Sequence, residues 1–244
     1  AGIFDDIYVP PAPGDDGTAL GAALQLWHDL MGQPRGAPLL RADLGPAFSE
    51  EEIRAELERL KLHATKPADL AAAAAERITS GEIVGWFQGR AEFGPRALGH
   101  RSMLANPTDP ATRARLVASV KARSEFHPFG LSVAAEAVPE LFEGARPSPF
   151  LERTARLKEE ARNRLPAVAT PGGVTRLHTV DAQRTPLFHQ LLLAVGARTG
   201  VPAVLNTSLN EPGRPMATTP RDAIGSLYTT GLDALALGPF LLAK

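Results

Sequence analysis

The chain has 244 residues, of which 44% are hydrophobic and 22% charged, and its formal net charge is −1. This is the composition of an ordinary globular protein with one large domain, or one domain and a fragment of another, and the near-neutral charge argues against a nucleic-acid surface. The absence of cysteine excludes disulfides, thiolate nucleophiles and cysteine-ligated zinc. No apolar run reaches membrane-spanning length and no signal-peptide pattern is present, so we expect a cytoplasmic protein with no membrane partner.

The first 47 residues divide into two parts. Residues 1–31 read as one unit, with a short strand over Ile3–Val9, a turn, and a helix over Thr18–Met31 that begins with small residues suited to close packing. Residues 32–47 are rich in glycine and proline and are typical of a linker.

From residue 48 onward, helical and strand patterns alternate. Ser49 and Glu52 match a capping box at the start of a helix. The predicted helices are Glu50–Lys61, Pro67–Thr79, Asp109–Lys121, Pro186–Thr199 and Thr219–Thr230, and the predicted strands are Ile83–Phe87, Leu131–Ala134, Val174–Val180, Ala203–Leu205 and Ala234–Leu242. The segment Phe150–Leu157 fits either a helix or a strand. The alternation predicts an α/β (α+β) fold with a mixed sheet.

The segment GRAEFGPRALGHRS places Arg90, Arg96 and Arg101 among glycines and a glutamate, directly after a predicted buried strand. Arginine presents a fork of donors that matches phosphate and carboxylate oxygens, and glycine lets the backbone approach a ligand closely. The segment therefore predicts a pocket for a polyanionic small molecule, such as a nucleotide or an acyl phosphate. The alternative is a solvated arginine-rich loop.

Three other segments carry polar groups near the end of a predicted element. Lys121 and Arg123 lie two residues apart at a helix end, where they could bind an anion or simply complement the helix dipole. Arg176 lies on an alternating strand, on the face that also carries His178, and could be a binding residue or a surface residue. The loop Asn206–Gly213 follows a strand and offers donors and acceptors for a ligand, or for its own turns.

A further candidate is GDDGTALG, in which Asp15 and Asp16 could bind a metal or a ribose, or could cap a helix. The six histidines are scattered, so we do not expect a complete metal site within this chain. Neither a nucleophile elbow nor a Walker A motif is present.

Taken together, these motifs resemble the ATP-dependent O-carbamoyltransferases of antibiotic and nodulation-factor biosynthesis. The resemblance covers nearly the whole chain in the correct order. It rests on GWFQGRAEFGPRALGHRS, ANPTDPATRARL, VKARSEFHPF, TRLHTVD, TGVPAVLNTSLNEPG and TGLDALALGPFLL. It implies that residues 1–31 are the C-terminal remnant of an ASKHA-type domain, 32–47 a linker, and 48–244 a YrdC-like domain with a mixed twisted sheet flanked by helices.

The resemblance also implies an activity: carbamoyladenylate is formed from carbamoyl phosphate and ATP with Mg²⁺, for transfer to a hydroxyl of a small-molecule acceptor by an N-terminal ASKHA-type domain in cis or in trans. It implies Lys121, Arg96 and Ser208 as catalytic residues. The residues implied for substrate and nucleotide binding are Arg90, Arg101, Arg123, Arg176, Asn206 and Asn210. Asp15 matches a ligand of Fe²⁺ or another divalent metal in the complete ASKHA-type domain, where histidines that this sequence lacks would complete the site.

The sequence departs from the family pattern at several positions. His127 stands where an arginine usually precedes Pro-Phe, Leu131 replaces a proline, and His178 replaces a glutamine; the aspartate often found near PGGVTR is absent. Because histidine carries less charge than arginine near neutral pH, His127 predicts weaker phosphate affinity unless another group substitutes.

Two other functions remain open at this stage. One is a tRNA-modifying carbamoyladenylate synthase, which would need threonine and bicarbonate, and the other is a non-catalytic nucleotide-binding module. The carbamoyltransferase hypothesis makes two spatial predictions. Side chains from Arg96 through Ser208 should share one anion-lined recess, and the helix Thr18–Met31 should have an exposed apolar face where its parent domain would pack.

Overall fold

The computed structural model describes residues 3–4, 7–121, 129–168, 170 and 172–244, and only the main chain of residues 119–121. Its strands form one eight-stranded sheet in the order β4-β5-β3-β6-β2-β1-β7-β8. They are β1 (Val84–Phe87), β2 (Arg101–Ala105), β3 (Gly130–Ala134), β4 (Arg153–Arg156), β5 (Val174–Val180), β6 (Ala203–Ser208), β7 (Ala234–Leu237) and β8 (Phe240–Ala243). The sheet contains parallel and antiparallel pairs, so the predicted mixed α/β fold is confirmed.

The helices begin where the sequence provides caps. Ser49 and Glu52 form the predicted capping box, and Thr219 with Asp222 forms a second one. The helices are α1 (Thr18–Gln25), α2 (Glu50–Arg59), α3 (Leu70–Thr79), α4 (Ala111–Arg115), α5 (Val138–Leu141), α6 (Glu159–Arg164), α7 (Pro186–Thr199) and α8 (Pro220–Thr229). Two π-helical segments, η2 (Leu26–Leu30) and η3 (Leu116–Lys121), continue α1 and α4.

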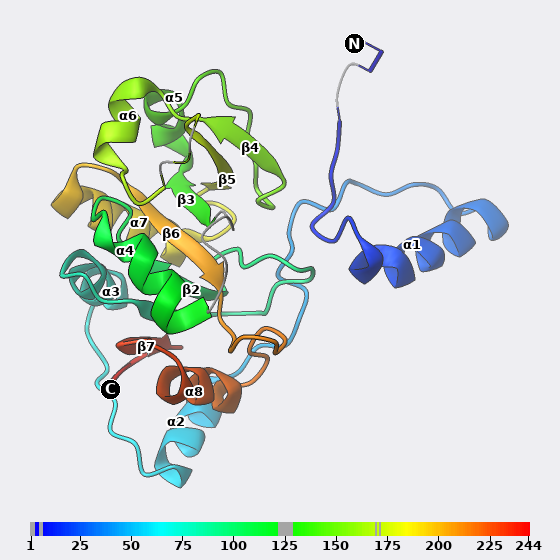
Figure 1. Ribbon diagram of the computed structural model, residues 1–244. Coiled ribbons are helices and arrows are strands. Elements are labelled where there is room, and N and C mark those ends of the chain that lie inside the picture. The colour runs from blue at the N-terminus through cyan, green and yellow to red at the C-terminus, as the bar shows by residue number, and fades with distance from the viewer. Residues whose placement is uncertain (1–2, 5–6, 122–128, 169, 171) are drawn as a thin grey trace.

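Helices cover both faces of the sheet (Figure 1). On one face, α3 and α7 pack together over the β1, β2 and β6 residues Trp86, Leu104 and Val204. On the other face, α2, α5, α6 and α8 enclose a second core. A strand that is covered on both faces needs apolar residues on both sides, which explains the unbroken apolar run at Ile83–Phe87.

The pairing of β6 determines where the polar groups meet. This strand is antiparallel to both of its neighbours, β2 and β3, whereas β3 and β5 are parallel. The end of β6 therefore lies beside the starts of β2 and β3. In register, Gly130 faces Asn206 on one side and Arg176 on the other.

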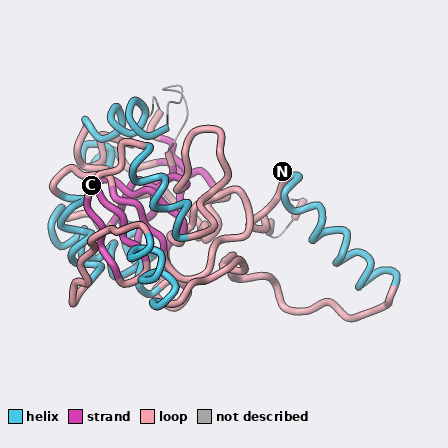
Figure 2. The backbone as a smooth tube through the Cα atoms, turned by 90° about the horizontal axis from the view of Figure 1, so that it is seen from below, coloured by secondary structure: helices cyan, strands magenta, loops and turns pink. Residues whose placement is uncertain are grey.

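The N-terminal segment extends away from the sheet and carries α1 outward (Figures 1 and 2). No residue of α1 or η2 is buried, and the exposed fractions of Leu24, Trp27 and Leu30 are 45%, 48% and 79%. The predicted exposed apolar face is confirmed. The predicted strand at Ile3–Val9 is wrong for its described residues, which are not paired with any strand.

Some elements differ from the sequence-based expectation. β2, α5 and α6 were not predicted, because they are short and β2 begins on Arg101 within a glycine-rich loop. The ambiguous segment Phe150–Leu157 contains the edge strand β4. β6 reaches Ser208 rather than Leu205, since strands pair with both of its sides. None of the helices described is long and apolar enough to cross a membrane.

Candidate anion-binding site

Glu92 organises the arginine-rich loop between β1 and β2. Its Oε1 accepts hydrogen bonds from the backbone N–H groups of Leu98 (2.7 Å), His100 (2.9 Å) and Arg101 (3.0 Å). Gly99 lies between them with φ +88°, and a Cβ there would come within 2.2 Å of the Phe188 ring. A carboxylate that accepts hydrogen bonds from three N–H groups holds the loop in a tight conformation. Glu92 and Gly99 therefore fix the backbone that carries the arginines of this loop.

Arg101 is a structural residue, and the expectation that it binds ligand is corrected. Its side chain is fully buried and lies 3.6 Å above the centre of the Phe87 ring. Its two terminal nitrogens donate to four backbone carbonyls, at 2.9 to 3.2 Å. Burial lowers the pKa of this guanidinium to about 10, although the charge of Glu92 opposes that shift. The carbonyls that it joins belong to Pro46, Gln88, Gly89 and His100.

Arg90 points to the linker. It donates to the carbonyls of Asp43 (3.1 Å) and Leu44 (2.7 Å), and it lines a different surface depression from that of Arg96. The structure therefore gives Arg90 the role of attaching residues 32–47 to the loop rather than a place beside the other predicted binding residues.

Four of the predicted residues share one cavity of about 370 Å³, which we call the anion cavity. They are Arg96 from the loop, Arg176 from β5, and Asn206 and Ser208 from β6. Ligand pockets commonly exceed about 300 Å³. Arg96 and Ser208, 112 positions apart in the chain, thus meet at one recess, as the sequence predicted. The remaining lining residues are Pro95, Ala97, Phe129, Gly130, Leu151 and Thr207.

Asn210 lies beyond the cavity wall. Its Oδ1 accepts a hydrogen bond from Ser208 Oγ at 2.6 Å, and its Nδ2 donates to the carbonyl of Arg214 at 2.6 Å. Asn210 lines a neighbouring depression instead of the anion cavity. Its place in the structure is therefore that of a residue that orients the Ser208 hydroxyl.

The predicted lysine segment is only partly described. Lys121 ends η3, and its side chain is not described, while Arg123 and His127 lie outside the described residues. The first two residues described after this segment, Phe129 and Gly130, line the anion cavity.

Asp15 begins a short 3-10 helix, Asp15–Gly17, at the base of α1. Within the described ranges, no three His, Asp or Glu side chains are placed to hold a metal ion. Asp15 is therefore not part of a group of three such side chains in this part of the chain.

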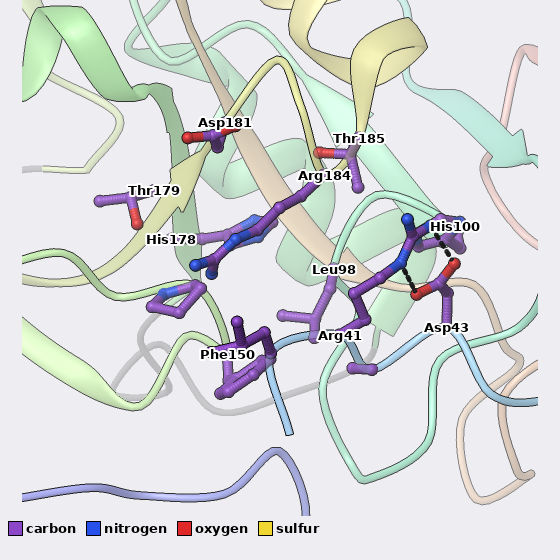
Figure 3. Close-up of a pocket in the computed structure, with 13 residues that line it drawn as sticks. Arg41, Asp43, Leu98, His100, Phe150, His178, Thr179, Asp181, Arg184 and Thr185 are labelled. Carbon is purple, nitrogen blue, oxygen red and sulfur yellow. Dashed lines mark hydrogen bonds and ion pairs between the residues drawn. The ribbon is translucent and has the colours of Figure 1, made fainter. Parts of the chain in front are cut away.

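A buried polar group that sequence reasoning did not select as a site residue lies behind the anion cavity. The Nδ1 of His178 is 2.9 Å from Ser132 Oγ, and the Nδ2 of Asn206 donates to the same oxygen at 2.9 Å. His178 also lines a small cavity of about 40 Å³ with Phe150 and Arg184 (Figure 3), which we call the histidine cavity. The sequence signals were that Arg176 and His178 share one face of an alternating strand and that His178 replaces a glutamine of the family pattern.

His178 makes stability sensitive to acid. Burial lowers its pKa from 6.5 to about 3, and the charge of His100 adds to that shift. Between these pH values the unfolded chain binds a proton that the folded chain does not. The free energy of unfolding therefore falls as the pH decreases, by about 1.4 kcal/mol per pH unit.

The wild-type chain should lose free energy of unfolding between pH 7 and pH 4.5, and replacing His178 with glutamine should remove about 3 kcal/mol of that loss. Urea unfolding at both pH values measures this, and equal losses in the two proteins would contradict it.

The structure is thus an α/β domain with a cavity lined by Arg96 and Arg176 at one edge of its sheet. A family model described as "Carbamoyltransferase C-terminus" matches residues 75–244. The chain therefore belongs to the carbamoyltransferase family of enzymes.

The relatives are longer than this chain. It is 40% identical over 255 residues to the nodulation protein NolO of Bradyrhizobium diazoefficiens, a match that covers 100% of this chain and 46% of NolO. It is 39% identical over 250 residues to the nodulation protein NolNO of Sinorhizobium fredii, over 100% of this chain and 37% of that protein. The chain thus spans less than half the length of these two relatives.

Among solved structures, full-length HypF in its phosphate- and nucleotide-bound form aligns with a TM-score of 0.48 and 16% identity, over 70% of this chain and 25% of HypF. The Sua5 protein of P. abyssi aligns with a TM-score of 0.45 and 14% identity, over 69% of this chain and 45% of Sua5.

Proposed function

We propose that this chain forms carbamoyladenylate from carbamoyl phosphate and ATP, as the C-terminal part of an O-carbamoyltransferase. The observation that carries the proposal is the convergence of Arg96, Arg176 and Ser208 on one cavity in a chain of the carbamoyltransferase family. Adenylyl transfer needs little covalent help from a protein. It needs the phosphates to be positioned and the charge developing on their oxygens to be neutralised, which arginine forks do well.

The reaction balances as two displacements. Water splits the carbamoyl–phosphate bond and phosphate leaves; a carbamate oxygen then attacks the α-phosphorus of ATP, and pyrophosphate leaves. Arg96 and Arg176 would hold phosphate oxygens, and Ser208 would turn its hydroxyl hydrogen from Asn210 Oδ1 to one of them when the ligand binds. Mg²⁺ would accompany the nucleotide and neutralise its phosphates. Lys121 and Arg123 would add cations from the adjoining segment.

The acceptor reaction belongs to a further domain in this proposal. Residues 1–31 would be the remnant of an ASKHA-type domain, in which Asp15 contributes one ligand to a divalent metal. The exposed apolar face of α1 and η2 and the greater length of the relatives support this division. That domain, in cis or in trans, would pass the carbamoyl group to a hydroxyl of a small-molecule acceptor.

Pyrophosphate release tests the proposal directly. The purified chain, incubated with ATP, Mg²⁺ and carbamoyl phosphate, should release pyrophosphate, and the release should stop when carbamoyl phosphate is omitted. Threonine with bicarbonate should not replace carbamoyl phosphate. Release that requires threonine would support a tRNA-modifying synthase instead, and binding of ATP without any turnover would support a non-catalytic module.

A further inference from the structure

Three buried polar side chains form a hydrogen-bonded row across adjacent strands. Asn206 on β6, Ser132 on β3 and His178 on β5 have exposed fractions of 3%, 0% and 3%. Ser132 is paired with His178 in the strand register, and its Oγ lies 2.9 Å from both the His178 Nδ1 and the Asn206 Nδ2. The row begins at a wall of the anion cavity and ends at the histidine cavity.

The partners determine the direction of every hydrogen bond in the row. The Nδ2 of Asn206 lies 3.0 Å from the carbonyl oxygen of Ala97, which can only accept, so the amide nitrogen must face it. The second amide hydrogen is donated to Ser132 Oγ. The Ser132 hydroxyl hydrogen is then available for His178 Nδ1, which accepts it when the imidazole is neutral with its proton on Nε2.

This arrangement leaves one acceptor without a partner. Both amide hydrogens of Asn206 are used, while its Oδ1 is buried and has no hydrogen-bond partner among the described residues. Asn206 itself lines the anion cavity. Because a buried carbonyl oxygen without a donor is destabilising, the site favours a ligand that brings an N–H group to this position.

We propose that Asn206 Oδ1 accepts a hydrogen bond from the N–H group of the carbamoyl moiety, and that Ser132 and His178 are positioning residues that hold the amide in this orientation. The inference rests on the proposed function and names the group that would make the site selective for a carbamoyl substrate. A carbamoyl group differs from an acetyl group by an NH₂ in place of a methyl of similar size. An oriented acceptor therefore selects carbamoyl phosphate over acetyl phosphate.

The test compares these two acyl phosphates as substrates for pyrophosphate release. For each protein, the ratio of kcat/KM with carbamoyl phosphate to kcat/KM with acetyl phosphate is measured. Asn206→Leu removes the acceptor, and Ser132→Ala and His178→Leu each break the row. We expect the ratio to be about tenfold lower in each variant than in the wild type, because one hydrogen bond to the substrate is lost or misdirected.

Two further variants separate positioning from general damage. His178→Gln keeps an acceptor for the Ser132 hydroxyl and should restore most of the ratio that His178→Leu loses. His189→Leu is the matched control, since His189 is also a buried histidine but pairs with Glu136 at 2.8 Å and lines neither cavity. It should keep the wild-type ratio. If Asn206→Leu fails to fold, Ser132→Ala and the two His178 variants still provide the test.

Calorimetric titration of the wild-type chain with carbamoyl phosphate, in the presence of ATP and Mg²⁺, separates the two possible failures. If the wild type neither binds carbamoyl phosphate nor releases pyrophosphate, the proposed function is wrong and this inference with it. If the wild type does both, but Ser132→Ala and His178→Leu keep the wild-type ratio, the function stands and the assignment of Asn206, Ser132 and His178 is overturned.

Discussion

Replacing Arg176 with alanine should lower the rate of carbamoyl-phosphate-dependent pyrophosphate release about 100- to 1,000-fold. Arg176 brings a guanidinium from β5 to the wall of the anion cavity, opposite the start of β3. A donor aimed at charge that develops in the transition state contributes about 3 to 4 kcal/mol, whereas a contact made equally in the ground state would change KM alone. We therefore expect kcat to fall more than KM rises.

The controls for this prediction are available within the chain. Arg176→Lys keeps a point charge without the fork and should recover only part of the rate. Arg198→Ala removes an exposed arginine on α7 that donates to the carbonyl of Ala194, outside the cavity, and should leave the rate unchanged. A wild-type kcat in Arg176→Ala would remove Arg176 from the catalytic machinery.

Replacing Arg101 with leucine should lower the free energy of unfolding by about 3 to 5 kcal/mol. The guanidinium joins four carbonyls of the linker and the arginine-rich loop and stacks on Phe87. Leucine would remove one donor from each carbonyl. Those of Pro46 and His100 keep a backbone N–H donor, whereas that of Gly89 would have none among the described residues, in a site where water has little access. An effect of this size is rare for a single substitution and needs such a mechanism.

Urea unfolding at neutral pH measures the effect of Arg101→Leu. Arg101→Lys should be intermediate, because one ammonium group cannot reach all four carbonyls. Arg90→Ala serves as the comparison, since Arg90 also donates to linker carbonyls but is exposed, and it should cost less than about 1 kcal/mol. Equal losses in Arg101→Leu and Arg90→Ala would show that Arg101 is not the structural centre of the loop.

Much of the fold follows from local sequence patterns. β5 and α7 have the bounds that alternation and helical spacing indicate, and the Ser49–Glu52 capping box is present as the residue types predict. β2 was missed because an arginine at its start resembles loop sequence. That arginine is buried among carbonyls of its own loop and of Pro46 in the linker, a tertiary arrangement that local patterns do not reveal.

The residues that meet at the anion cavity were predictable only in part. Arg96, Arg176, Asn206 and Ser208 meet as expected, since the loop before β2, the first half of β5 and the end of β6 lie beside one another. The three arginines of one loop, however, point in different ways, and only Arg96 faces the cavity. Which arginine faces a ligand depends on tertiary contacts, and here Glu92 and the linker decide it.

The parallel pairing of β1 with β7 has a kinetic consequence. Hydrogen bonds at this junction join residues 150 positions apart, such as Ile83 and Asp233. Contacts of such long sequence separation form late, because the entropy of closing the intervening loop must be overcome before the contacts can form. The anion cavity, whose β6 wall is joined to β7 only through β2 and β1, would reach its final shape late in refolding. Ligand binding should therefore recover in the slow phase, after much of the helical signal has returned.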